Sequence, residues 1–227
     1  MAGEKQWYVY GLCGTGLPGR LTVRGHALRA IPIVGRGSST RLAIVAVVEP
    51  VIARVEPTIE TLQTQHDIVT RIAARVPALI PARFGSTMSE RALQERVEAH
   101  DADIRAALRR VRGRAQMTIR VFGEPDLPAP AAPRAVSGTA FLEQRRARAH
   151  YVPAEVALIR EQLGAHAKAE RVEPGERTLR VTVFHLVPRN AVETYRQRAS
   201  ALQATLAPRQ VTVSGPAPAF AFAPELW

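Results

Sequence analysis

A short apolar segment between two prolines constrains the fold of this chain most strongly. Residues Ala78–Ile80 lie between Pro77 and Pro81. Because a proline disrupts the helical turn before it, any helix that precedes this segment ends at Pro77. Ser86 and Ser89 then offer N-caps for a second helix. The pattern predicts a buried strand between two helices that cover a sheet.

Apolar periodicity extends this pattern over the first half of the chain. Two stripes of side chains spaced three and four residues apart predict helices over residues 57–76 and 89–111. They comprise Ile59, Leu62, His66, Val69, Ala73 and Val76 in the first helix, and Leu93, Val97, His100, Ile104, Leu108 and Val111 in the second. Apolar and β-branched runs at 7–12, 21–24, 30–34, 42–48 and 116–122 predict strands. Residues 1–123 are therefore expected to form an N-terminal α+β domain.

A proline-rich segment separates this domain from the rest. Residues 124–137 carry four prolines among alanines, a composition typical of a stiff linker. Beyond it we expect a helix over 138–166 with a break at Pro153, then two strands, one of them the half-exposed strand over 179–185, then a helix capped by Asn190 and ended by Pro208, and a strand from Gln210. The expected fold class is thus α+β with two domains, each a small sheet covered by helices. The second domain, residues 138–227, is ferredoxin-like in character but lacks one strand.

Composition limits the class of protein. The formal net charge is +11, and arginine supplies nearly all positive charge because Lys5 and Lys168 are the only lysines. Residues 1–123 hold 18 basic and 10 acidic side chains, a net charge of +8, and residues 124–227 contribute the remaining +3. No apolar run reaches the roughly 18 residues of a membrane span. The N-terminus lacks an apolar signal core, so we expect cytoplasmic synthesis.

No motif in the sequence predicts catalysis or a cofactor. Residues Gly14–Gly19 match G-x-G-x-x-G, but a predicted strand follows where a nucleotide site needs a helix. His66 and His100 could ligate a metal with Glu60 or Asp103, although neither helix pairs ligands at i and i+4. We favour buried core histidines, an inert Cys13, and a protein that is not an enzyme and has no metal or cofactor site.

Arginines are the remaining candidates for a binding site. Arg83 precedes a predicted helix and could contact a partner, but an ion pair with Glu90 or Asp67 is the favoured interpretation. Five arginines gather at the end of the second helix: Arg105, Arg109, Arg110, Arg112 and Arg114. Cations there complement the helix dipole, and they could also steer an acidic partner.

Four separated segments together resemble one protein family. They are residues 7–12, residues 66–85 with their closing Ile-Pro-Ala-Arg-Phe-Gly, residues 138–142, and residues 213–222 with their Ser-Gly-Pro. In order and spacing they are similar to the gas vesicle GvpL/GvpF family over nearly the whole chain. Ala217 and Ala219 depart from the larger aromatics that the family usually carries there.

The resemblance implies a non-enzymatic accessory protein for gas vesicle assembly, located with gas vesicles in the cytoplasm. Its expected partners are the small, apolar, acidic shell protein and other vesicle accessory proteins. The alternative from composition is a nucleic-acid-binding α+β protein driven by arginine charge. RNA readers of this architecture present aromatic side chains on an open sheet, and no strand here carries that pattern, so we expect no nucleic acid partner. The partner-binding candidates are Arg83, Arg109, Arg110 and Arg112.

Overall fold

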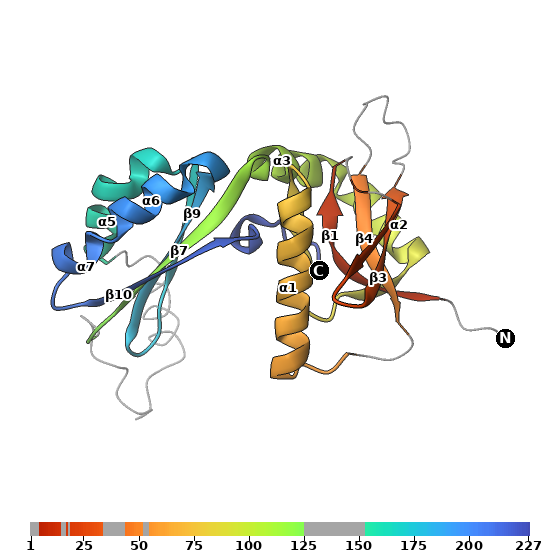
Figure 1. Ribbon diagram of the computed structural model, residues 1–227, viewed down its shortest axis with the longest axis horizontal. Coiled ribbons are helices and arrows are strands. Elements are labelled where there is room, and N and C mark those ends of the chain that lie inside the picture. The colour runs from red at the N-terminus through yellow and green to blue at the C-terminus, as the bar shows by residue number, and fades with distance from the viewer. Residues whose placement is uncertain (1–4, 15–16, 18, 34–43, 52–54, 125–152) are drawn as a thin grey trace, which may run out of the picture. The chain divides into compact units, whose positions relative to one another are not determined.

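The computed structural model describes residues 5–14, 17, 19–33, 44–51, 55–124 and 153–227. Its contacts divide the chain into two compact units (Figure 1). The first comprises Met1–Arg114 together with Ala217–Trp227, and the second comprises Ala115–Pro216. Of the helices in the described ranges, none combines the length and apolarity that a membrane crossing requires.

The first unit is built on a six-stranded sheet with β1 at its centre. The strands are β1 (Gln6–Cys13), β2 (Arg20–Val23), β3 (His26–Ile33), β4 (Ile44–Val51), β5 (Leu79–Pro81) and β6 (Thr87–Ser89), in the order β2-β3-β4-β1-β5, with β6 also paired to β1. β1 is antiparallel to β4, β5 and β6, and its register with β4 shifts between Val9 and Gly11. The proline-bounded strand of the sequence is β5, and it pairs directly with β1.

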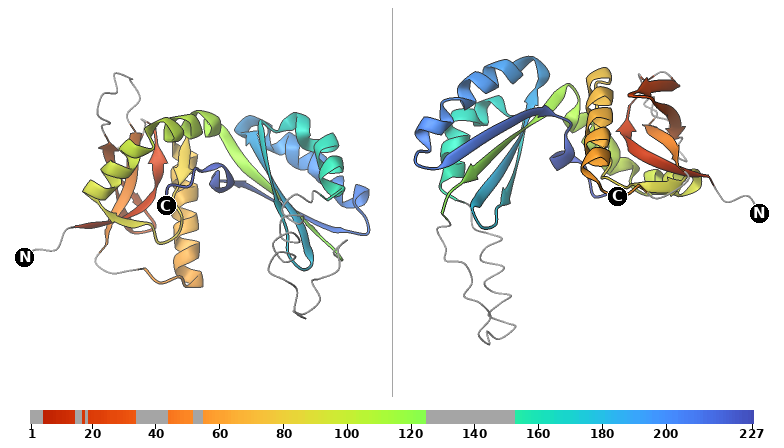
Figure 2. Two further views of the ribbon diagram at one scale, coloured as in Figure 1. Left: turned by 180° about the vertical axis from the view of Figure 1, so that it is seen from behind. Right: turned by 60° about the horizontal axis from the view of Figure 1, so that its bottom comes forward.

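Helices cover both faces of this sheet. They are α1 (Ile59–Arg75), α2 (Glu90–Ala99) and α3 (Asp101–Val111). Because side chains alternate along a strand, Tyr8 and Tyr10 of β1 pack with α1, whereas Trp7 and Val9 pack with α2 and α3. Figures 1 and 2 show these helices on opposite sides of the sheet.

The first helix exists where predicted, but the predicted stripe is only partly buried: Val69 and Val76 are buried, whereas His66 is exposed. The buried residues of α1 are Gln65, Ile68, Val69 and Ile72, whereas Ile59 is 77% exposed and Leu62 is 45% exposed. The polar Gln65 points inward because Tyr8 donates a hydrogen bond to its amide oxygen and its amide nitrogen donates to the Ala82 carbonyl at 3.2 Å.

The sequence predicts one continuous second helix, but the structure divides it into α2 and α3. His100 ends α2 in a non-helical conformation, with φ −120° and ψ 20°, and α3 starts at Asp101. Acidic side chains at Asp101 and Asp103 favour a new helix N-terminus at this point.

The second unit has the connectivity and strand order of a complete ferredoxin-like fold. Its elements are β7 (Arg114–Phe122), α5 (Glu155–Leu163), β8 (Ala169–Pro174), β9 (Leu179–Pro188), α6 (Val192–Ala199), α7 (Leu202–Thr205) and β10 (Gln210–Ala217), with short 3₁₀ helices at Gly164–His166 and Arg189–Ala191; a third, Phe220–Phe222, follows in the first unit. The sheet order is β10-β7-β9-β8. The α+β class is confirmed, and the strand that the sequence analysis found missing is β7, which precedes the linker.

Two details of this unit correct the sequence analysis. The strand at 179–185 is not half-exposed, because β9 is an interior strand and its Arg180, Thr182 and His185 are buried. Asn190 does not cap a helix, since it lies within a 3₁₀ turn and α6 follows Ala191 without a side-chain cap. Residues 138–152 of the helix predicted over 138–166 and nearly all of the linker lie outside the described residues, and the described end of that helix contains α5.

The C-terminal segment returns to the first unit. Leu226 is buried in the core cluster that contains Trp7 and Leu93, and Arg96 Nη1 donates to the Leu226 carbonyl at 2.8 Å. The compact units therefore differ from the expected boundaries at 123 and 138, because β7 lies in the second unit and residues 217–227 lie in the first. Whether residues 1–123 and 138–227 fold as separate domains stays a prediction.

Leu226→Ala tests the contribution of the C-terminal segment to the first core. The substitution removes a side chain that is 4% exposed, so we expect the free energy of unfolding to fall by about 2–4 kcal/mol. Urea unfolding, with amide exchange in β1 and β4, measures the effect. Leu62→Ala, at an exposed position, is the control and is expected to change stability by less than about 0.5 kcal/mol. Equal effects of the two substitutions would contradict this role of the segment.

Candidate partner-binding surface

Helix α3 presents its arginines to solvent because its opposite face is buried. Ile104, Ala107 and Val111 pack into the core, and this leaves Arg109 and Arg110 on the exposed side. Arg112 follows at the C-cap and is also exposed. The negative end of the helix dipole stabilises cations in this position.

Two of the five clustered arginines are engaged within the chain. Arg105 Nε donates to the carboxylate of Asp101 at 2.8 Å, one helical turn away, and Arg114 Nη1 donates to the Arg110 carbonyl at 2.6 Å. The side chains of Arg109, Arg110 and Arg112 differ from these two, because among the residues that the structure describes no carboxylate lies within ion-pair distance of any of the three. They form what we call the α3 arginine surface.

Arg83 forms a different ion pair from either one predicted. Asp67 pairs with Arg24 at 2.6 Å, and Glu90 belongs to the first turn of α2, so the favoured interpretation of Arg83 is wrong. Its Nη2 atom instead lies 3.7 Å from Glu225 Oε1, and both side chains are largely exposed. Exposed pairs of this length contribute little stability. Arg83 therefore pairs with the C-terminal segment and is not part of the α3 arginine surface.

Comparison with known proteins decides the family. A family model described as gas vesicle synthesis protein GvpL/GvpF matches residues 6–224. The chain belongs to the GvpL/GvpF family. Its fold is similar to the crystal structure of GvpF from Microcystis aeruginosa, with a TM-score of 0.71 and 12% identity over 96% of this chain and 99% of that one. GvpF from Anabaena sp. PCC7120 gives a TM-score of 0.69 at 12% identity, over 97% and 98%. The comparison with curated proteins finds no match.

The GvpL/GvpF match confirms the family resemblance that four segments of the sequence predicted. It supports a role in gas vesicle assembly.

The other sequence candidates do not assemble into a site. His66 and His100 are both exposed, so the interpretation as buried core histidines was wrong. No group of three potential metal ligands occurs among the described residues. Burial raises the pKa of the Cys13 thiol to about 12, which leaves it protonated and unreactive at neutral pH. Strand β2 begins at Arg20, directly after the glycine-rich segment, where a dinucleotide site would need a helix.

Sequence reasoning missed one cluster of titratable groups in the second unit. His185 is fully buried, with Nδ1 2.8 Å from the Tyr195 hydroxyl and Nε2 3.1 Å from Glu170 Oε2. Glu170 also accepts a hydrogen bond from Arg160 Nε at 2.8 Å. A tyrosine, histidine and carboxylate in series resemble a proton relay, but His185 and Tyr195 are both 0% exposed and no substrate can reach them. The cluster therefore fixes β9 against β8 and α6.

Burial and pairing determine the charge states of this cluster. Burial lowers the pKa of His185 below its ordinary value, despite the neighbouring Glu170. Burial alone would raise the pKa of Glu170, but hydrogen bonds from Arg160 and His185 outweigh it and hold that pKa below its usual range. We infer a neutral His185 that donates from Nε2 to an ionised Glu170 and accepts from Tyr195.

This arrangement predicts a loss of stability in mild acid. The unfolded chain takes up a proton on His185 near pH 6.5, whereas the folded chain takes it up only at lower pH. Stability that is complete above pH 6.5 should therefore fall at up to about 1.4 kcal/mol per pH unit as the pH decreases toward 5. His185→Gln, which can still donate to Glu170 and accept from Tyr195, should remove most of this slope. Urea unfolding at a series of pH values measures it, and equal slopes in both proteins would contradict the assignment.

Proposed function

We propose that this protein acts in gas vesicle assembly by binding the small vesicle shell protein, and that the α3 arginine surface receives it. The proposal rests on one observation: Arg109, Arg110 and Arg112 are exposed and lack carboxylate partners among the described residues. Membership in a gas vesicle synthesis family supports the role in assembly. The proposal locates the protein in the cytoplasm, on or beside gas vesicles.

Charge makes an acidic partner the best fit to this surface. The chain carries a net charge of +11, of which residues 1–123 supply +8. A field of this sign raises the rate at which an acidic protein is encountered. Because exposed charges are screened beyond about 8 Å at physiological salt, the field accelerates association more than it holds a complex together.

Arg83 is the proposed second contact. Its pair with Glu225 is long and exposed, so a carboxylate of the partner can replace Glu225 at little cost. Arg83→Ala should therefore weaken shell-protein binding without changing the stability of the free protein by more than about 0.5 kcal/mol. An unchanged affinity would show that Arg83 does not contact the partner.

Charge reversal tests the α3 arginine surface directly. The triple substitution Arg109→Glu, Arg110→Glu and Arg112→Glu should lower the association rate with purified shell protein by about tenfold at low salt, with a much smaller change in the dissociation rate. Reversal loses the favourable interaction with the helix dipole, about 0.3–1 kcal/mol per charge. It breaks no ion pair within the described residues, so the fold should persist. Stopped-flow association over a salt series measures the effect.

A matched control separates local from overall charge. Arg71→Glu, Arg75→Glu and Arg198→Glu change the net charge by the same amount at other exposed positions. An equal loss of association rate in this control would show that only the overall charge matters and would contradict a defined surface. Tighter binding of generic RNA than of shell protein at the same salt would favour the nucleic-acid alternative.

A further inference from the structure

Strand β10 forms one edge of the sheet in the second unit. The sheet order β10-β7-β9-β8 gives β10 a single neighbour, β7, among the described strands. The outer peptide groups of an edge strand are free to pair with another chain unless the protein covers them. The side chains that cover this edge therefore show which of its peptide groups remain open.

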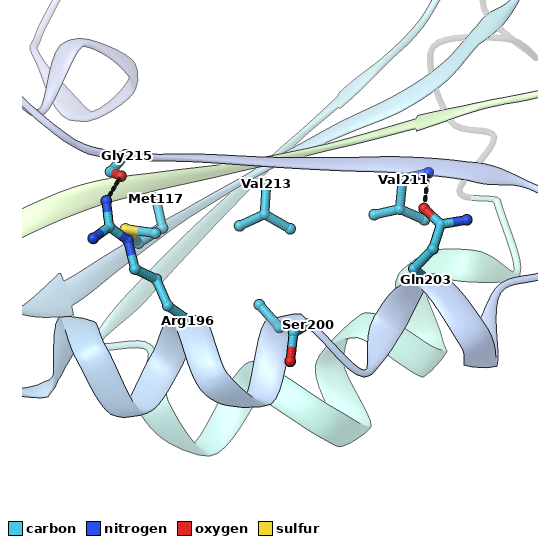
Figure 3. Close-up of a pocket in the computed structure, with 8 residues that line it drawn as sticks. Met117, Arg196, Ser200, Gln203, Val211, Val213 and Gly215 are labelled. Carbon is cyan, nitrogen blue, oxygen red and sulfur yellow. Dashed lines mark hydrogen bonds between the residues drawn. The ribbon is translucent and has the colours of Figure 1, made fainter.

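Two side chains cover the ends of the β10 edge. The side-chain oxygen of Gln203 accepts from the Val211 N–H at 2.9 Å, and Arg196 Nη2 donates to the Gly215 carbonyl at 2.5 Å (Figure 3). These bonds show that the N–H of residue 211 and the carbonyl of residue 215 point outward, away from β7. Because peptide groups alternate between the two edges of a strand, Val213 also directs its N–H and carbonyl outward, midway between the two covers.

An open groove lies beneath this edge. It has a volume of about 460 Å³ and lies between β10 and the helices α6 and α7. Val211 and Val213 point toward the helices across it. Met117 and Ala199 also line the groove and add apolar surface. The half-buried valines pack against the main core of the unit, so the groove borders that core.

Charge limits what this groove can accept. Arg196 is exposed at one end, and no carboxylate lies within ion-pair distance of it in the described ranges. A second copy of this chain would bring another arginine-rich surface with net charge +11 against it, which repulsion disfavours. A strand with a carboxylate near Arg196 is complementary in charge as well as in hydrogen bonding.

We propose that β10 and the groove beneath it bind an extended, acidic segment of a partner protein, which adds as a fifth strand to the sheet. The segment pairs with the outward peptide groups around Val213 and inserts alternate apolar side chains between β10 and the helices. A carboxylate at one end lies beside Arg196. This contact is separate from the α3 arginine surface and does not depend on it.

Binding of a synthetic strand to the full-length protein tests the proposal. The probe is a nine-residue peptide that alternates valine with threonine and carries two glutamates at one end. It should bind and slow amide exchange at Val213, as measured by NMR. Val213→Pro removes the outward N–H at a position where an edge strand tolerates proline, and it should lower affinity about tenfold. The matched control Val213→Thr keeps the N–H and the branched shape, and it should change affinity less than about twofold.

Two further measurements keep the test decisive if Val213→Pro disturbs folding. Peptides methylated on alternate backbone nitrogens should differ, because only one set of N–H groups faces β10. Arg196→Glu should reverse the preference, so that a peptide with lysines in place of glutamates binds better than the original. Equal binding of the two methylated peptides, no change in exchange at Val213, or pairing of two copies of this chain through Val213 would each overturn the proposal.

Discussion

The first unit depends on how closely β1 approaches β5. A Cβ atom on Gly11 would lie 2.6 Å from the Ile80 carbonyl oxygen, closer than any real contact of this kind, so only glycine fits there. The register of β1 with β4 also shifts between Val9 and Gly11. Past this point β1 pairs with β5, and through its alternating side chains it connects the two helical layers. A larger residue at position 11 would push β1 away from β5 and so displace the strand on which both cores pack.

The elements that the sequence predicted well are those that local signals determine. Pro77 precedes β5 and Pro81 is its last residue, and Ser89 caps α2 by accepting a 3.2 Å hydrogen bond from the Ala92 N–H. The inward position of Gln65 in the buried face of α1 could not be predicted from apolar spacing, because it depends on Tyr8 and Ala82, which come from distant parts of the chain. A polar side chain can be buried when distant parts of the chain supply its hydrogen-bond partners.

Long-range connections also explain the missing strand and the displaced boundaries. The ferredoxin-like unit takes its first strand from before the proline-rich segment, and nothing local to β7 indicates that its neighbours are β9 and β10. Strand β8 carries Glu170, Arg171 and Glu173 with little apolar alternation, and its pairing with β9 explains why it is a strand. At the arginine surface, the sequence predicted five clustered cations but could not indicate that Arg105 and Arg114 are engaged within the chain.

The two proposed contacts would control different steps of one recognition process. Exposed arginines act over the Debye length and change how often an acidic partner is encountered, so added salt weakens their effect. Strand addition acts only on contact, through directional hydrogen bonds and burial of apolar side chains, and it therefore changes mainly how long a partner stays. A partner that carries both features is captured quickly and released slowly, whereas one that carries only charge is released quickly. Pairing with an edge strand requires an extended backbone, whereas attraction by charge does not. A basic protein that meets many acidic molecules therefore gains selectivity for extended partners.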